Sequence, residues 1–203
     1  MVSSSQRTAL LEKYHYINVE FHDWWDSVEE NFKQDMKEVG IQVDKVYFSG
    51  FWSQGDGACF TGSMSDGALK YLDHHHKDQF PMIRKLIEAG GGVYAYCKHD
   101  GHYYHEYCTS FWTDNDRFVG ILECPTEFQE QIAEQWDDLL ANEMADLEDA
   151  ITNQWRTYMK GLYHNLEEEY DHLTSDDEVW ATIEANELIE DVDDDEDDYD
   201  AAA

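Results

Sequence analysis

Proline, cysteine and positive charge are all scarce in this sequence. Its 203 residues include two prolines, four cysteines and 13 lysines and arginines, against 46 aspartates and glutamates. The formal net charge at pH 7 is therefore −33. A field of that sign repels nucleic acid and anionic membranes, and it attracts basic protein surfaces. We expect no direct binding of nucleic acid or membrane by this chain, and a basic protein as its partner.

Long apolar runs are missing as well. No segment approaches the roughly 20 apolar residues that cross a bilayer. The first residues lack the apolar run flanked by basic residues that marks a secretory signal. The four cysteines show no close metal-type spacing, and thiols usually stay reduced in the cytosol. These absences lead us to expect a cytoplasmic protein.

Aromatic residues, in contrast, are abundant. The chain has 7 Trp, 13 Tyr and 9 Phe, and 42% of its residues are hydrophobic, which is enough for a core of ordinary size. We expect one domain of the α+β class over residues 1–186. Residues 187–203 are expected to form a disordered acidic tail, because their composition offers little to bury.

The most regular pattern of the chain lies between residues 126 and 173. Apolar residues form rows that step by eleven positions, such as Met144, Trp155 and Leu166. An eleven-residue repeat has about 3.67 residues per turn, so the apolar stripe stays on one side of a nearly straight helix. We predict a single long helix here. The alternative is a bent pair of helices, broken near Asn153 or Gly161.

One side of this predicted helix carries acidic residues whose charge no basic residue balances, since no lysine or arginine occurs between residues 127 and 149. Ordinary solvated faces mix the two signs, because pairs at i, i+4 are mildly stabilising. The mean axial spacing of about 4 Å per charge is close to the roughly 3.4 Å per phosphate along a DNA strand. The candidate partner-binding residues, each expected to stand in for a phosphate, are Glu127, Glu130, Glu134, Asp137, Asp138, Asp146, Glu148 and Asp149.

The remaining pattern predicts a small antiparallel sheet. Two strands are expected within residues 43–60, on either side of a glycine-rich turn. Asp100-Gly101 predicts a two-residue type I′ hairpin that joins residues 93–99 to residues 102–110. The tyrosine-rich face of this hairpin either packs beneath helices or forms an exposed aromatic interface. A further strand is expected over residues 118–123, and the covering helices over residues 24–39, 65–76, 79–89 and part of the long helix.

Two histidine-rich stretches are candidate metal sites. One is the tract from His74 to His76, and in the other Cys97 and Cys108 flank three histidines. The predicted hairpin places Cys97 and Cys108 about 13 Å apart, which is too far for two ligands of one tetrahedral ion. We therefore expect surface histidines and no bound metal or other cofactor.

A sequence pattern typical of nucleophilic catalysis is also absent. The sequence has no Gly-x-Ser-x-Gly elbow, and its Gly55-Asp56-Gly57 turn is too short to cradle a phosphate. We expect no enzymatic activity. The alternative is a small enzyme that uses the loop over residues 53–59 together with His99 or His105.

Several stretches carry a resemblance to a known family. They are Phe48-Ser-Gly-Phe-Trp-Ser-Gln-Gly-Asp-Gly-Ala-Cys-Phe-Thr-Gly62, Gly101-His-Tyr-Tyr-His-Glu-Tyr-Cys108, and Leu173-Thr-Ser-Asp-Asp-Glu178 with Ile183-Glu-Ala-Asn186. From about Tyr14 to Asn186 the chain resembles small bacteriophage proteins that are often described as antitoxins of toxin–antitoxin stability systems. The resemblance implies a viral protein in the host cytosol and brings no catalytic residues. The chain departs from an ordinary antitoxin in having no basic DNA-binding arm.

Together these features predict a phage inhibitor that acts by mimicry of DNA. Its acidic face would dock on the basic groove of a nucleic-acid-binding host protein, such as a restriction, CRISPR, repair or transcription factor, and would serve as counter-defence. The alternative is an antitoxin-like protein that masks a cognate toxin through an aromatic, largely apolar surface. The long helix also offers a surface for a homodimer.

Overall fold

The computed structural model describes residues 2–88, 92–114 and 141–191. The chain divides into two compact units, one formed by Met1–Asp26 with Glu167–Ala203 and the other by Ser27–Leu166. We call them unit 1 and unit 2 and describe each by itself. The expectation of one domain over residues 1–186 stays a prediction. None of the helices in the described ranges combines the length and the apolar character needed to span a membrane.

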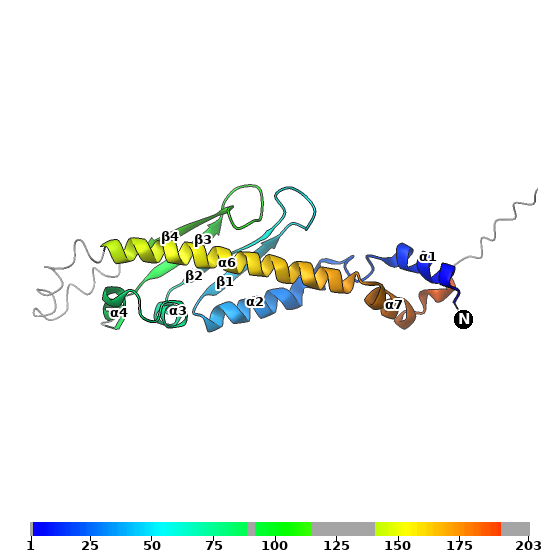
Figure 1. Ribbon diagram of the computed structural model, residues 1–203, viewed down its shortest axis with the longest axis horizontal. Coiled ribbons are helices and arrows are strands. Elements are labelled where there is room, and N and C mark those ends of the chain that lie inside the picture. Colours follow the sequence, from blue (N-terminus) through cyan, green and yellow to red (C-terminus); the bar gives the residue numbers. More distant parts are fainter. Residues whose placement is uncertain (1, 89–91, 115–140, 192–203) are drawn as a thin grey trace, which may run out of the picture. The chain divides into compact units, whose positions relative to one another are not determined.

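Unit 2 contains a four-stranded antiparallel sheet with the strand order β1-β2-β3-β4 (Figure 1). Each strand pairs with its neighbour in the sequence, and β1 has an irregularity between Val43 and Lys45. The predicted fold class, α+β with a small antiparallel sheet packed by helices, is therefore confirmed. The strands are β1 (Gln42–Phe48), β2 (Ala58–Met64), β3 (Tyr94–His99) and β4 (Thr109–Asp114). The further strand predicted over residues 118–123 lies outside the described residues.

Two helices cover one face of this sheet. Phe60 of β2 packs against Phe32 of α2 (Asp26–Glu38), with ring centroids 5.4 Å apart, and against Trp155 of α6 (Ala141–Leu173) at 5.7 Å. Full burial of a large apolar side chain contributes roughly 1.5–3 kcal/mol. Two shorter helices, α3 (Ala68–His75) and α4 (Pro81–Glu88), match the predicted ones.

The long helix α6 runs without a break through Asn153 and Gly161, so the bent alternative is wrong for this span. Its 33 residues correspond to about 50 Å at about 1.5 Å per residue. The eleven-residue rows predicted most of its buried side, but Tyr158 and Leu173 of these rows are only half-buried and Met159 is buried without belonging to them. The buried residues are Met144, Leu147, Ile151, Trp155, Met159, Leu162 and Leu166. The part predicted over residues 126–140 lies outside the described residues.

The pairing of β3 with β4 differs from the predicted hairpin. The two-residue turn at Asp100-Gly101 would place His99 opposite His102, whereas the structure places His99 opposite Thr109. Residues 100–108 instead form a loop, in which the Asp100 N–H donates to the Cys108 carbonyl over 2.7 Å. The observed register directs Phe111 at Trp155, with ring centroids 6.1 Å apart. Phe111 is half-buried, and its packing on Trp155 favours the observed register over the local turn preference.

Gly40 lies just after the end of α2 and has the conformation that ends a helix. Gly40 has a φ of 91°, its N–H donates to the Lys37 carbonyl, and the Ile41 N–H donates to the Met36 carbonyl over 2.8 Å. This pair of bonds is the Schellman motif, which satisfies the last carbonyls of a helix. A Cβ atom at Gly40 would lie 2.4 Å from the carbonyl oxygen of Gly67, so no other residue fits there without rearrangement.

Unit 1 is helical. Leu10 of α1 (Ser4–Tyr14) is buried with Val179 and Ile183 of α7 (Asp176–Ala185), and Ser3 begins α1 with a capping box. The other short elements are the 3-10 helices η1 (His22–Trp25) and η4 (Leu188–Asp191). The 3-10 helix η4 falls within residues 187–203, the range predicted as a disordered acidic tail. The rest of the tail, residues 192–203, lies outside the described residues.

Two glycine substitutions test the backbone argument. Gly40→Ala should lower the free energy of unfolding by at least about 1 kcal/mol, because of its positive φ and the contact with Gly67. Gly161→Ala is the matched control: it lies within α6 with open space around it, and it should raise stability by about 0.5–1 kcal/mol. Urea unfolding of both variants measures the difference, and equal effects would contradict the assignment.

Candidate functional site

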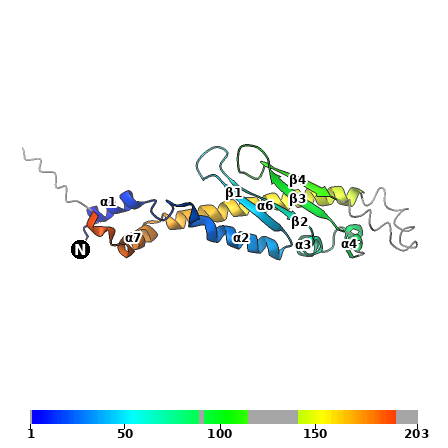
Figure 2. The same cartoon turned by 180° about the vertical axis from the view of Figure 1, so that it is seen from behind.

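Exposed aromatic residues occur on β3 and β4, and Figure 2 shows these strands in front of α6. Along β3, Ala95 and Cys97 are buried whereas Tyr96 and Lys98 are exposed, as the predicted alternation requires. Tyr96 lies opposite Trp112 of β4, and the two rings stack with centroids 5.3 Å apart. The Nζ atom of Lys98 lies 5.9 Å from the Trp112 ring centre. An aromatic pair with a cation beside it therefore faces solvent.

Two loops extend from one end of the sheet and lie side by side in both views: residues 49–57, between β1 and β2, and residues 100–108, between β3 and β4 (Figures 1 and 2). They touch at glycines. A Cβ atom at Gly55 would lie 2.4 Å from the Tyr103 ring, and one at Gly57 would lie 2.6 Å from the His105 Cβ atom. The two glycines of the Gly-Asp-Gly motif therefore allow the two loops to pack closely against each other.

Asp56 fixes the first loop from within. Its Oδ2 atom accepts hydrogen bonds from the backbone N–H groups of Trp52, over 2.9 Å, and Ser53, over 2.6 Å. The Asp56 N–H donates to the Ser53 carbonyl over 3.0 Å, which closes a tight turn. These bonds hold the backbone of Trp52 while its side chain remains 75% exposed.

All exposed large aromatic residues among the described residues of unit 2 come from β3, β4 and these two loops. Tyr103 is 51% exposed and Tyr107 is 64% exposed. The Arg156 guanidinium of α6 lies 5.3 Å from the Tyr107 ring centre, and the Lys160 Nζ atom lies 5.8 Å from it. We call this set the aromatic surface: Trp52, Tyr96, Tyr103, Tyr107 and Trp112. Tyrosine and tryptophan are the residue types that anchor protein interfaces.

The residues of the enzyme alternative are placed as follows. Cys59 is fully buried, and burial, with a smaller effect of Cys108, raises the pKa of its thiol to about 12. A thiol in that state is a poor nucleophile. The Nε2 atom of His99 lies 2.9 Å from the Tyr103 carbonyl oxygen, so this histidine ties its own loop together. Cys59 of the loop over residues 53–59 is therefore not an activated nucleophile.

His105 and Cys108 form the one thiol–imidazole contact recorded among the described residues. The Cys108 Sγ atom and the His105 Nε2 atom are 3.5 Å apart. The Tyr107 N–H donates to Nδ1 of His105 over 3.1 Å, so Nδ1 carries no proton. In the neutral imidazole the proton then sits on Nε2, which donates toward the sulfur. A general base would have to accept the thiol proton instead.

The histidine tract packs against α6. His75 Nε2 forms a hydrogen bond with the Tyr158 hydroxyl. Burial, together with His74 and His76, lowers the pKa of His75 to about 4, and burial raises the pKa of Tyr158 to about 12. No group of three or more His, Cys, Asp or Glu residues in the described ranges is arranged to hold a metal ion.

The predicted acidic face is described only in part. Asp146 and Asp149 are exposed and about 60° apart around α6. Glu148 accepts a hydrogen bond from the Thr113 hydroxyl over 2.7 Å. Their neighbour Glu143 accepts from the backbone N–H groups of Met82 and Ile83 in the first turn of α4, so it caps that helix. The other predicted residues, Glu127, Glu130, Glu134, Asp137 and Asp138, lie outside the described residues.

Comparison with known proteins identifies the family of this chain. The model described as "Domain of unknown function (DUF8835)" matches residues 24–176. The chain belongs to the DUF8835 family. No curated protein and no solved structure matches it. The DUF8835 match includes the whole sheet, both loops and every residue of the aromatic surface.

The half-buried side chain of His75 gives a pH test. The folded-state pKa of His75, about 4, lies below the ordinary value of 6.5. Between these values the unfolded chain binds a proton that the folded chain does not, so His75 lowers stability as the pH falls through this window and has no effect above it. His75→Gln should therefore lose less stability than the unaltered protein between about pH 7 and about pH 4.5.

The measurement is the urea midpoint at the two pH values. His102→Gln, a substitution in the exposed loop, is the matched control. The same pH dependence in both variants would show that His75 is not the group responsible.

Proposed function

We propose that this DUF8835 protein is a binding module that docks on a partner protein through its aromatic surface. The observation that carries the proposal is the concentration of exposed Tyr and Trp over β3, β4 and the two loops. Interface energy is usually carried by a few large aromatic or arginine anchors. A partner masked in this way is also what the antitoxin-like alternative requires.

The surface is held in shape before any partner arrives. Asp56 ties the first loop to itself, and Gly55 and Gly57 seat the second loop against it. Ordering a mobile side chain at an interface costs about 0.5–1.5 kcal/mol. Anchors such as Tyr107, which lies beneath Arg156 and Lys160, avoid part of that cost.

The local charge differs from that of the whole chain. Lys98, Arg156 and Lys160 lie beside aromatic rings of this surface, although the chain carries a net charge of −33. The acidic field is thus partly offset where docking takes place. We expect a complex formed mainly by apolar and aromatic contacts, and therefore one that resists salt.

The acidity itself favours a second candidate function. A net charge of −33 attracts a basic, nucleic-acid-binding protein, and the exposed Asp146 and Asp149 would contribute to such a contact. Binding by mimicry of DNA should weaken steeply with salt and yield to competing duplex DNA.

One capture experiment distinguishes the two functions. The unaltered protein, the triple variant Trp52→Ala/Tyr103→Ser/Tyr107→Ser and the variant Asp146→Lys/Asp149→Lys serve as baits in bacterial lysate, with washes of rising salt. We expect the partner to stay on the unaltered protein and the lysine variant at high salt. It should be lost from the triple variant, because each anchor contributes about 2 kcal/mol, or roughly 30-fold in affinity.

Phe21→Ala is the matched control, since Phe21 is 70% exposed but belongs to unit 1. It should retain the partner as the unaltered protein does. A partner that is released by salt, displaced by duplex DNA and lost from the lysine variant would support mimicry instead. Retention of the partner by a folded triple variant would overturn the proposal.

A further inference from the structure

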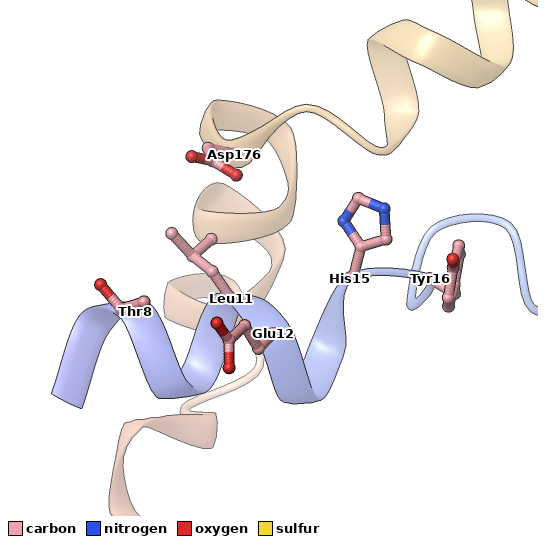
Figure 3. Close-up of a pocket in the computed structure, with 6 residues that line it drawn as sticks. All are labelled: Thr8, Leu11, Glu12, His15, Tyr16 and Asp176. Carbon is pink, nitrogen blue, oxygen red and sulfur yellow. The ribbon is translucent and has the colours of Figure 1, made fainter. Parts of the chain in front are cut away.

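A hollow in unit 1 lies between α1 and the first turn of α7. Its volume is about 460 Å³, which falls in the range of small-ligand pockets. Figure 3 shows Glu12 on α1 and Asp176 at the beginning of α7. The lining residues are Thr8, Leu11, Glu12, His15, Tyr16 and Asp176.

The local fold holds the two walls of the hollow together. Leu10 is buried with Val179 and Ile183, and Leu11 packs against this cluster, so α1 stays on α7. Ser175 begins α7 by accepting a hydrogen bond from the Glu178 N–H over 3.4 Å, which places Asp176 in the first turn. The hollow is therefore a fixed product of helix packing.

The carboxylates of Glu12 and Asp176 have no hydrogen bond or ion pair within the described ranges of the chain, and both side chains are exposed. The sequence of unit 1 contains a single arginine and a single lysine. Arg7 lies over the Trp180 ring at 4.9 Å, and Lys13 over the Tyr14 ring at 5.1 Å. A hollow with two carboxylates in so acidic a unit concentrates cations.

Aromatic rings complete the hollow. His15 and Tyr16 line it, with ring centroids 4.6 Å apart in an edge-to-face arrangement. The face of such a ring attracts a cation, and the guanidinium group stacks on rings better than the strongly hydrated ammonium group. A guanidinium also donates paired hydrogen bonds to a carboxylate.

We propose that this hollow binds a guanidinium group. Glu12 and Asp176 supply the charge and accept its hydrogen bonds, and Tyr16 supplies a ring for stacking. The group comes either from a free small molecule or from an arginine side chain of a polypeptide. The site does not depend on the aromatic surface, so the two proposals can fail separately.

The test is a titration of the full chain with arginine blocked at both ends, followed by amide shifts in NMR spectra. We expect saturating shifts confined to the residues around the hollow. Glu12→Gln and Asp176→Asn should each weaken binding by about threefold, in line with exposed ion pairs. Tyr16→Leu should weaken it as well, and blocked lysine should bind less tightly than blocked arginine.

Glu20→Gln and Asp177→Asn are the matched controls, because each removes one negative charge from unit 1 without lining the hollow. They should bind as the unaltered protein does. Shifts that spread over acidic residues without saturating, or equal weakening by all four charge variants, would overturn the site and leave only a general attraction of cations. The triple variant of the aromatic surface should bind blocked arginine normally.

A second arm identifies the source of the guanidinium. A short peptide with one internal arginine is titrated in the same way. Shifts of the same amides with equal or higher affinity assign the site to a polypeptide arginine. Binding of blocked arginine but not of the peptide assigns it to a free small molecule.

Discussion

Trp155 closes the inner face of the sheet, where Phe60 and Phe111 pack against its ring. Much of unit 2 depends on this contact. It holds α6 on the sheet, and it sets the register of β4 by directing Phe111 inward. Because neighbouring strand residues point to opposite faces, the same register directs Trp112 outward beside Tyr96. The exposed aromatic pair is thus a geometric consequence of the packing of Phe111 on Trp155.

Acidic side chains have two uses in this chain. Some serve the fold as acceptors: Glu143 caps α4, Glu148 accepts from Thr113, and Asp56 accepts from two backbone N–H groups of its loop. Others, such as Asp146 and Asp149, remain exposed and add to self-repulsion, which opposes the compact state. Counting carboxylates along a helix does not separate these uses, because Glu143 and Glu148 find donors that are distant in the sequence.

Periodicity predicted the regular part of the fold. The eleven-residue rows predicted most of the buried side of α6, and the helix predicted over residues 24–39 corresponds to α2. Local turn chemistry failed for β3 and β4, since the packing of Phe111 on Trp155 outweighed the preference of Asp100-Gly101 for a tight turn. The sequence predicted only part of the candidate site. The alternation of Tyr96 and Lys98 predicted one face of the sheet. The contacts of Gly55 and Gly57, in contrast, join segments about 50 residues apart. No local pattern encodes such a contact.

The meeting of the two loops has a consequence for how the sequence can change. A side chain at Gly55 requires space that Tyr103 now fills, and one at Gly57 requires space beside His105. Substitutions in the two loops are therefore expected to be non-additive, with energies that couple across the contact. Natural variants of this surface should alter both loops together, and transfer of its binding properties to another sheet would require both loops to be moved as one piece.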